Sequence, residues 1–92
     1  MLELKQTTQF KKDLQRMVKR GTDIGLLDEV IFLLRERKPL PAKYEDHPLT
    51  GNWAGYRDCH IRPDWLLIYR INDEALVLTA TRTGTHSEIF QR

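Results

Sequence analysis

Hydrophobic residues in the first third of the chain recur at helical spacing. Phe10, Leu14, Met17 and Val18 stand at i, i+4, i+7 and i+8, which places them on one face of a helix that Gly21 ends. After a short turn the same helical spacing returns at Leu26, Leu27, Val30, Ile31 and Leu34. The prolines of residues 39–41 follow this second helix. The two patterns predict a helical hairpin.

The second half of the chain has the texture of β-strands. Three apolar or alternating runs, "YRDCHIR", "WLLIYRI" and "ALVLTAT", are separated by the turn pairs Pro63-Asp64 and Asn72-Asp73. Such short connections make antiparallel hairpins. A further short strand is predicted at residues 2–5, and residues 39–54, with three prolines and no periodicity, are predicted to form a long ordered loop.

These elements predict one α+β domain over residues 1–92, in the order β-α-α-β-β-β. We expect a twisted antiparallel sheet with the helical hairpin packed on one face and a short helical turn at the C-terminal end. A chain of 92 residues has no room for a second core.

Composition narrows the class of protein. With 40% apolar and 30% charged residues the chain is globular, and its apolar runs fall far short of the ~20 residues of a membrane span. One cysteine allows no internal disulfide and no multi-cysteine zinc site. The first residues, "MLELK", lack the pattern of a signal peptide, so we expect a cytoplasmic protein that does not contact membranes.

The formal net charge of +2 is modest, but its distribution is uneven. Five basic residues crowd the first predicted helix, where the one acidic residue is Asp13: Lys11, Lys12, Arg16, Lys19 and Arg20. A surface of this kind can bind phosphate groups or an acidic protein, and it can equally be the solvated back of a helix.

Candidate chemistry gathers at one end of the predicted sheet. The first and third strands of a meander run the same way, so His60 and Arg82 emerge at the same rim, where the middle strand begins with Asp64. Gly84 permits a bend that brings His86 over the sheet. Another histidine, His47, lies in the proline-rich loop, and Phe90 is either a stacking platform for a base or a plug of the core.

Histidines, a carboxylate and an arginine suit the cleavage of RNA by its own 2′-hydroxyl. One imidazole removes the 2′-hydroxyl proton, another protonates the departing 5′-oxygen, and arginine stabilises the charged phosphorane. A metal site is the competing interpretation, but the chain has no HxH, HExxH or CxxC spacing to support it. We therefore predict neither a metal nor another cofactor.

The motifs "DHPL", "GYRDCHIRPDWLLIY" and "RTGTHSEIF" resemble those of the RelE/ParE superfamily of bacterial toxins, most closely its YafQ branch. The similarity covers nearly the whole chain and agrees with the predicted fold. It implies a toxin of a toxin–antitoxin system, an endoribonuclease that cuts translated mRNA in the ribosomal A site.

The resemblance also implies roles and partners. The resemblance implies that His47, His60, Asp64 and His86 are catalytic. It also implies that Arg82 is the phosphate-binding catalytic arginine and that Phe90 is the aromatic side chain near the mRNA. It lets the five basic residues of the first helix face ribosomal RNA. The implied partners are the ribosome, mRNA and an antitoxin of the DinJ type, through which the complex would bind operator DNA.

We assign His86 as the general acid, and either His47 or, as the second choice, His60 as the base. The main alternative is a toxin of the ParE kind, which shares the fold but binds DNA gyrase and needs no histidine cluster.

Overall fold

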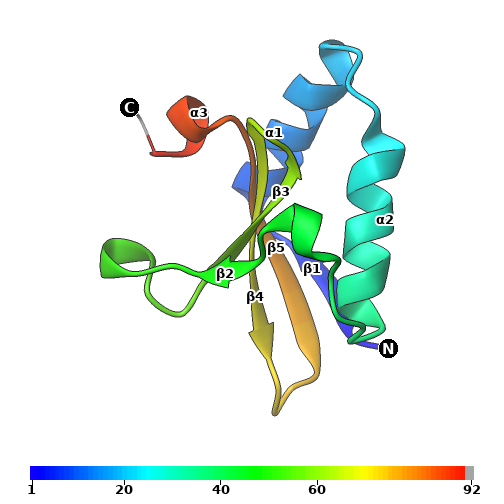
Figure 1. The fold of residues 1–92 in the computed structure, drawn as a ribbon, viewed down its shortest axis with the longest axis vertical. Helices are drawn as coiled ribbons and strands as arrows, with labels where there is room; N and C mark the ends of the chain where they lie inside the picture. Colours follow the sequence, from blue (N-terminus) through cyan, green and yellow to red (C-terminus); the bar gives the residue numbers. More distant parts are fainter. Residues whose placement is uncertain (91–92) are drawn as a thin grey trace.

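The structure, a computed structural model, describes residues 1–90 and contains one five-stranded sheet (Figure 1). Its strand order is β1-β5-β4-β3-β2, and the strands are β1 (Glu3–Gln6), β2 (His47–Pro48), β3 (Arg57–Arg62), β4 (Trp65–Asn72) and β5 (Val77–Gly84). Strands β3, β4 and β5 form the predicted antiparallel meander.

Two details of the sheet differ from the sequence prediction. Strand β1 pairs with β5 in parallel, so the sheet is mixed rather than wholly antiparallel. The proline-rich loop contributes the two-residue strand β2, where His47 pairs with Asp58 and Pro48 with Arg57. A strand of two residues is too short to leave a period in the sequence, which is why only a loop was expected.

The helical hairpin is confirmed, and its local causes are visible. Helix α1 (Thr8–Lys19) begins where the Thr7 hydroxyl accepts a hydrogen bond of 2.9 Å from the Phe10 N–H. Helix α2 (Ile24–Arg35) begins where the Asp23 carboxylate accepts one of 3.1 Å from the Gly25 N–H. Between them Gly21 adopts φ = 76°, a left-handed conformation that favours glycine.

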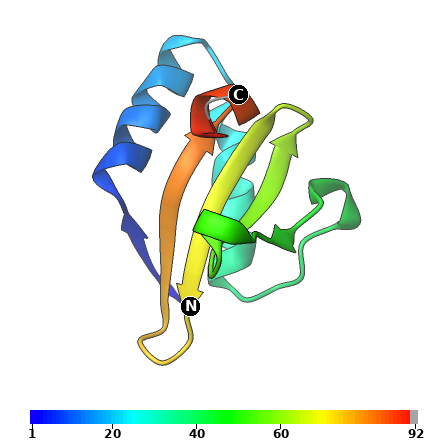
Figure 2. The same cartoon turned by 90° about the vertical axis from the view of Figure 1, so that its left-hand side faces the viewer.

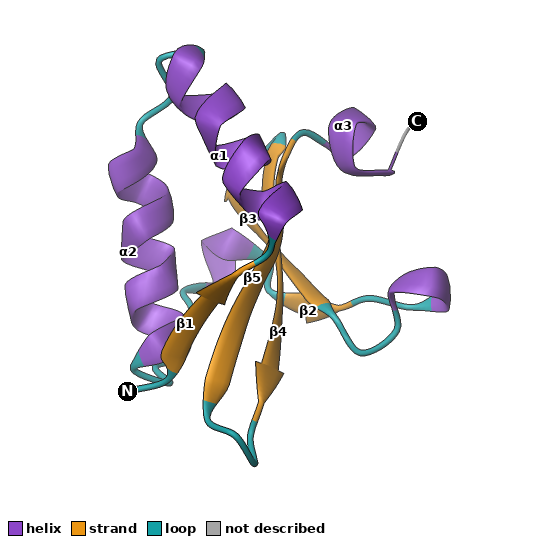
Figure 3. Ribbon diagram, turned by 180° about the vertical axis from the view of Figure 1, so that it is seen from behind, coloured by secondary structure: helices purple, strands orange, loops and turns teal. Residues whose placement is uncertain are grey.

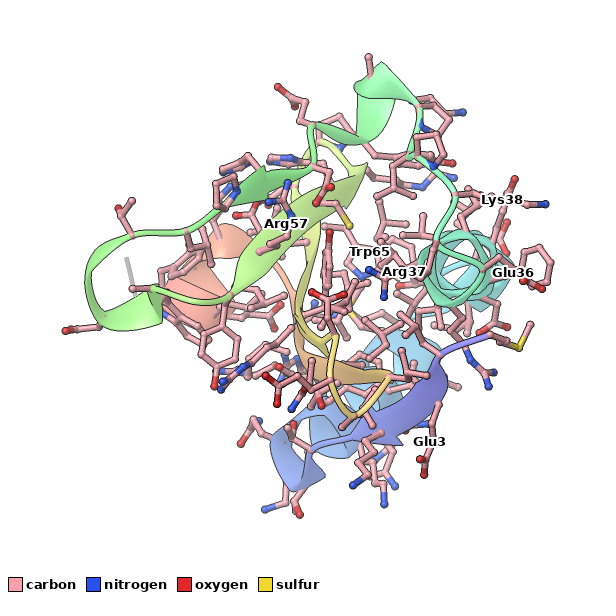
Figure 4. All side chains as sticks on the ribbon, turned by 90° about the horizontal axis from the view of Figure 1, so that it is seen from below. Glu3, Glu36, Arg37, Lys38, Arg57 and Trp65 are labelled. Atoms are coloured by element: carbon pink, nitrogen blue, oxygen red, sulfur yellow. The ribbon has the colours of Figure 1, made fainter. Side chains whose placement is uncertain are left out.

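Both helices cover the same face of the sheet (Figure 3). Seen along α2, Trp65 lies in the layer between that helix and the strands (Figure 4). The core on this face joins Phe10, Met17, Leu27, Val30 and Leu34 of the helices to Cys59, Leu67, Tyr69, Leu78 and Ala80 of the sheet. These are the periodic positions of the sequence, apart from the partly or largely exposed Leu14, Leu26, Ile31 and Val18.

The opposite face carries a smaller apolar cluster. Leu66 and Ile68 of β4 pack against Ile89 of the predicted short helix α3 (His86–Phe90) and against side chains of the loop around the short 3₁₀ turn Gly51–Trp53. Figure 2 shows α3 standing at the end of β5. The cluster thus holds the last helix over the rim where the chemistry was predicted.

No helix among residues 1–90 is long and apolar enough to cross a membrane.

Candidate active site

His86 and Asp64 form a contact at the predicted rim. Asp64 lies in the turn between β3 and β4, and His86 is the first residue of α3. The Nδ1 atom of His86 lies 3.0 Å from Asp64 Oδ1, and the His86 backbone N–H lies 3.4 Å from the same oxygen. The hydrogen bonds from His86 lower the pKa of Asp64, so the carboxylate is ionised and Nδ1 is the donor. The Nε2 atom of His86 is left to exchange a proton with a substrate.

His60 lies beside His86, as the topology predicted. The two ring centroids are 5.5 Å apart. The Nδ1 atom of His60 is buried and 3.6 Å from Glu45 Oε2, too far for a hydrogen bond, and it has no hydrogen-bond partner among the described residues. His60 is therefore held by packing rather than by a polar partner at Nδ1.

His47 reaches the same place from strand β2. Its Nδ1 atom lies 2.7 Å from the backbone carbonyl oxygen of Glu45 and 3.1 Å from Asp58 Oδ1. Both neighbours are acceptors, so Nδ1 carries the proton and Nε2 is the free nitrogen. The short strand missed by the sequence analysis is thus what brings the third histidine into the site.

Asp58 is the residue of this site that the sequence analysis did not select. It is buried, it lies two residues before His60 on the same face of β3, and it pairs with His47 of β2. Burial raises its pKa, while the charges of His47, His60 and His86 lower it. The alternation of Asp58 and His60 in "RDCHIR" was the available signal, because alternate residues of a strand share a face.

These side chains surround a cavity of about 370 Å³. Three histidines and a carboxylate share its wall with apolar and hydroxyl side chains, namely His47, Asp58, His60, His86, Leu49, Thr50, Trp53 and Phe90. Phe90 packs edge-on against Trp53 at 5.9 Å and lies 6.4 Å from the His86 ring. Its two predicted roles are therefore compatible, since the ring belongs to the second apolar cluster and also lines the cavity.

Arg82 was predicted at the same rim as the histidines, but it is not among the side chains that line their cavity. It pairs with Ile68 of β4, which pairs with Asp58 of β3, so the three share a cross-strand row. Its guanidinium, however, is bound to the buried Asp13 of α1, with Nε 2.7 Å from Oδ2. Burial opposes the ionisation of Asp13, but hydrogen bonds from Arg82, Gln9 and Thr83 hold its pKa below the usual value.

The five basic residues of α1 divide into two groups. Arg16 Nε lies 2.8 Å from Glu88 Oε2 and Arg20 Nη1 lies 3.0 Å from Glu88 Oε1, so both arginines tie α1 to α3. Lys11, Lys12 and Lys19 are exposed, and no ion pair involves them within the described part of the chain. The lysines, rather than the arginines, are the freely available charge of this helix.

Among the residues that the structure describes, the candidate metal donors are not grouped for coordination. Within residues 1–90, no three His, Cys, Asp or Glu side chains are placed to hold one metal ion together. Cys59 is buried and burial raises the pKa of its thiol, so it supplies no thiolate.

Comparison with known proteins identifies a family for this chain. Residues 2–91 match the family model described as "Bacterial toxin of type II toxin-antitoxin system, YafQ". The chain is 44% identical to the mRNA interferase toxin YafQ of Escherichia coli K12 over 89 residues, which cover 96% of this chain and 95% of that protein.

Solved structures agree with the sequence comparison. A metal-bound toxin from Helicobacter pylori superposes with a TM-score of 0.93 at 43% identity and covers 98% of this chain and 100% of its own. The toxin in a DinJ–YafQ complex of E. coli gives a TM-score of 0.88 at 43% identity, with 98% and 99% covered. The chain therefore belongs to the YafQ family of bacterial toxins of type II toxin–antitoxin systems.

Proposed function

We propose that this toxin is an endoribonuclease that cuts translated mRNA in the ribosomal A site by metal-independent general acid/base catalysis. The observation that carries the proposal is the convergence of His47, His60 and His86 on one cavity, each from a different element. A relative with 44% identity is named an mRNA interferase, which gives the site its substrate class.

The arrangement suits cleavage through the 2′-hydroxyl. His86 is the general acid for the 5′-oxygen, because Asp64 Oδ1, 3.0 Å from Nδ1, holds the ring so that Nε2 is free to pass a proton to the substrate. His47 is the first candidate for the base and His60 the second. The proton passes from the 2′-hydroxyl to Nε2 of the base, the 2′-oxygen attacks phosphorus, and the bond to the 5′-oxygen breaks as that oxygen takes a proton from His86.

Arg82 remains our proposed cation for the phosphorane. Its position in the same cross-strand row as Ile68 and Asp58 supports this role. Its hydrogen bond to Asp13 limits how many of its N–H groups are free for a phosphate. The guanidinium has five N–H groups, so it must keep Asp13 with some and offer others to a phosphate oxygen, or leave Asp13 when RNA binds.

Several partners follow from this function. Lys11, Lys12 and Lys19 would face ribosomal RNA, and Phe90 would stack on a base of the mRNA. The E. coli relative is solved in complex with DinJ, so we propose a DinJ-like antitoxin, through which the complex would contact operator DNA. All of these proposed partners are found in the cytoplasm, so we propose that the toxin acts there.

No step of this mechanism passes through a metal ion. The H. pylori relative is described as metal-bound, but the donors in residues 1–90 of this chain do not form a metal-binding group. Cleavage should therefore persist in excess EDTA, and a reaction that stops in EDTA and returns with added divalent metal would refute metal independence.

The gyrase-binding alternative is not favoured, because the E. coli relative is named an mRNA interferase. A pulse of expression discriminates the two functions. A nuclease arrests translation and leaves new mRNA 5′ ends that are in register with codons, whereas a gyrase poison induces DNA damage and leaves mRNA intact.

The catalytic assignment is tested with His86→Ala. We expect the variant to keep its fold and its antitoxin binding and to lose at least about 10²-fold in the cleavage of ribosome-bound mRNA, because the general acid is removed. Ser87→Ala, one residue further on the exposed side of α3, is the matched control and should cleave normally. A His86→Ala protein that cuts at near the wild-type rate would refute the assignment.

A further inference from the structure

The most unusual group of the site is the carboxylate of Asp58. Its side chain is 6% exposed, and Oδ1 receives no hydrogen bond among the described residues, although His47 Nδ1 lies 3.1 Å away. The Nδ1 proton of His47 is directed to the closer Glu45 carbonyl oxygen instead, at 2.7 Å. A buried carboxylate without a full set of donors destabilises a fold, so stability does not account for Asp58.

Asp58 is surrounded by the three histidines of the site. His47 of β2, His60 of β3 and His86 of α3 line the same cavity, and the charge of each acts on this carboxylate. Three other carboxylates face the cluster: Asp46, whose negative charge raises the pKa of Asp58, Glu45, whose side chain is 70% exposed, and Asp64, which contacts His86. Asp58 is thus the one buried carboxylate among three imidazoles in residues 1–90.

We propose that Asp58 is a positioning residue of the nuclease, the shared counter-ion that lies beside His47 and stabilises the imidazolium formed when His47 or His60 takes the 2′-hydroxyl proton. The proposal rests on the proposed function and deepens it. Asp58 touches no substrate in this role and acts through the histidines.

The consequence is a division of labour between two carboxylates. Asp64, with a side chain 74% exposed, serves the acid His86, whereas the buried Asp58 serves the base. The carboxylate of Asp58 is less screened by water than that of Asp64, because it is buried, whereas its partner His47 is half-exposed.

The first test measures the histidines themselves and needs no nuclease activity. In the purified full-length toxin with ¹⁵N-labelled histidine, NMR titration gives the midpoint and the tautomer of each imidazole. In Asp58→Asn we expect the His47 midpoint to move to lower pH by about half a unit or more, with a smaller shift of His60 in the same direction. A His47 shift of less than that would overturn the counter-ion role.

Glu45→Gln is the matched control, since it removes a carboxylate from the same cluster that is exposed to water. We expect it to shift the midpoints less than Asp58→Asn does. If Asp58→Asn fails to fold, the wild-type protein still decides. The ¹³C chemical shift of the Asp58 carboxylate must then change over the pH range in which His47 titrates. A chemical shift that stays constant over that range would overturn the proposal.

The second test separates positioning from a merely structural role. The acid limb of the cleavage pH profile reports the base, which must be neutral to act. In Asp58→Asn this limb should move to lower pH while the plateau rate falls by about tenfold or more. A uniform loss of rate with an unmoved limb would overturn the positioning role, and if the wild type cuts no mRNA the proposed function fails while the titration still decides the counter-ion role.

Discussion

At the scale of single residues, two turn aspartates of similar exposure differ in what they contact. Asp64, in the β3–β4 turn, has a side chain 74% exposed and contacts His86, whereas Asp73, in the β4–β5 turn, is 73% exposed and contacts Arg37. Exposed ion pairs contribute little to stability, so neither is expected to hold the fold. Replacing Asp64 should therefore change the rate and pH profile of cleavage, whereas replacing Asp73 should change neither, and neither replacement should change stability.

Asp64→Asn should weaken the general acid. The hydrogen bonds from His86 lower the pKa of Asp64 below its usual 3.8, so the wild-type carboxylate stays ionised throughout a kinetic pH range of about 5 to 9. Removing its charge destabilises the imidazolium of His86. The alkaline limb of the cleavage profile, which reports loss of the acid, should move to lower pH.

Asp73→Asn is the control for this change and should leave both the limb and the rate unaltered. Thermal unfolding should be nearly the same for both variants and the wild type. An Asp64→Asn profile that overlays the wild-type profile would remove Asp64 from the mechanism.

At the scale of elements, α3 is held in place by the carboxylate of Glu88, which we call the carboxylate clamp. Glu88 Oε1 accepts the Thr85 N–H at 3.0 Å, and the Thr85 hydroxyl accepts the Glu88 N–H at 3.2 Å, a reciprocal capping box. Arg16 and Arg20 of α1 bind the same carboxylate. A five-residue helix has little stability of its own, so this clamp and Ile89 are what position His86.

Glu88→Gln should loosen α3. Hydrogen bonds to Arg20 lower the Glu88 pKa from 4.5 to about 2, so the carboxylate stabilises the fold above the unfolded value and that contribution is lost as pH falls from 4.5 toward 2. At neutral pH we expect a loss of about 1–2 kcal/mol in the free energy of unfolding and a lower cleavage rate.

The measurement is chemical denaturation at several pH values. The gap between wild type and Glu88→Gln should narrow as pH falls below 4.5 and close only near pH 2, where the wild-type carboxylate is also protonated. Glu74→Gln, in the exposed β4–β5 turn, is the control and should show no gap at any pH. A constant gap would mean that the charge of Glu88 is not what stabilises α3.

The elements also show which parts of the fold a sequence can predict. The helical hairpin was predictable because its causes are local, such as the Thr7 cap and the left-handed Gly21. The pairing of Leu4 with Leu78 was not, since no local signal fixes the partner of an edge strand.

The site likewise has a part that the sequence predicts and a part that it does not. Topology placed His60, Asp64 and His86 together, whereas the contact of Arg82 with Asp13 and the selection of Asp58 depend on side-chain geometry across elements. For the same reason Arg16 and Arg20 appear as RNA contacts in the sequence and as ligands of Glu88 in the structure.

At the scale of the whole molecule, the proposed ribosome contact depends on where free charge lies. Lys11→Gln with Lys12→Gln should weaken binding to ribosomes and reduce its dependence on salt, because fewer counter-ions are released. Lys38→Gln with Lys43→Gln removes the same charge from the segment that follows α2 and should have a smaller effect. Equal losses in the two double variants would indicate that net charge, not the α1 surface, governs binding.

The parallel pairing of β1 with β5 has a consequence for the order of events during synthesis. The Thr7 hydroxyl donates to the Thr81 carbonyl across 74 residues of sequence, so β1 has no strand to join until most of the chain has been made. Closing so long a loop is entropically unfavourable and belongs late in folding. Because His86 lies beyond β5, a half-made chain has neither a closed sheet nor its proposed general acid, and we expect it to be inert toward the ribosome that is making it.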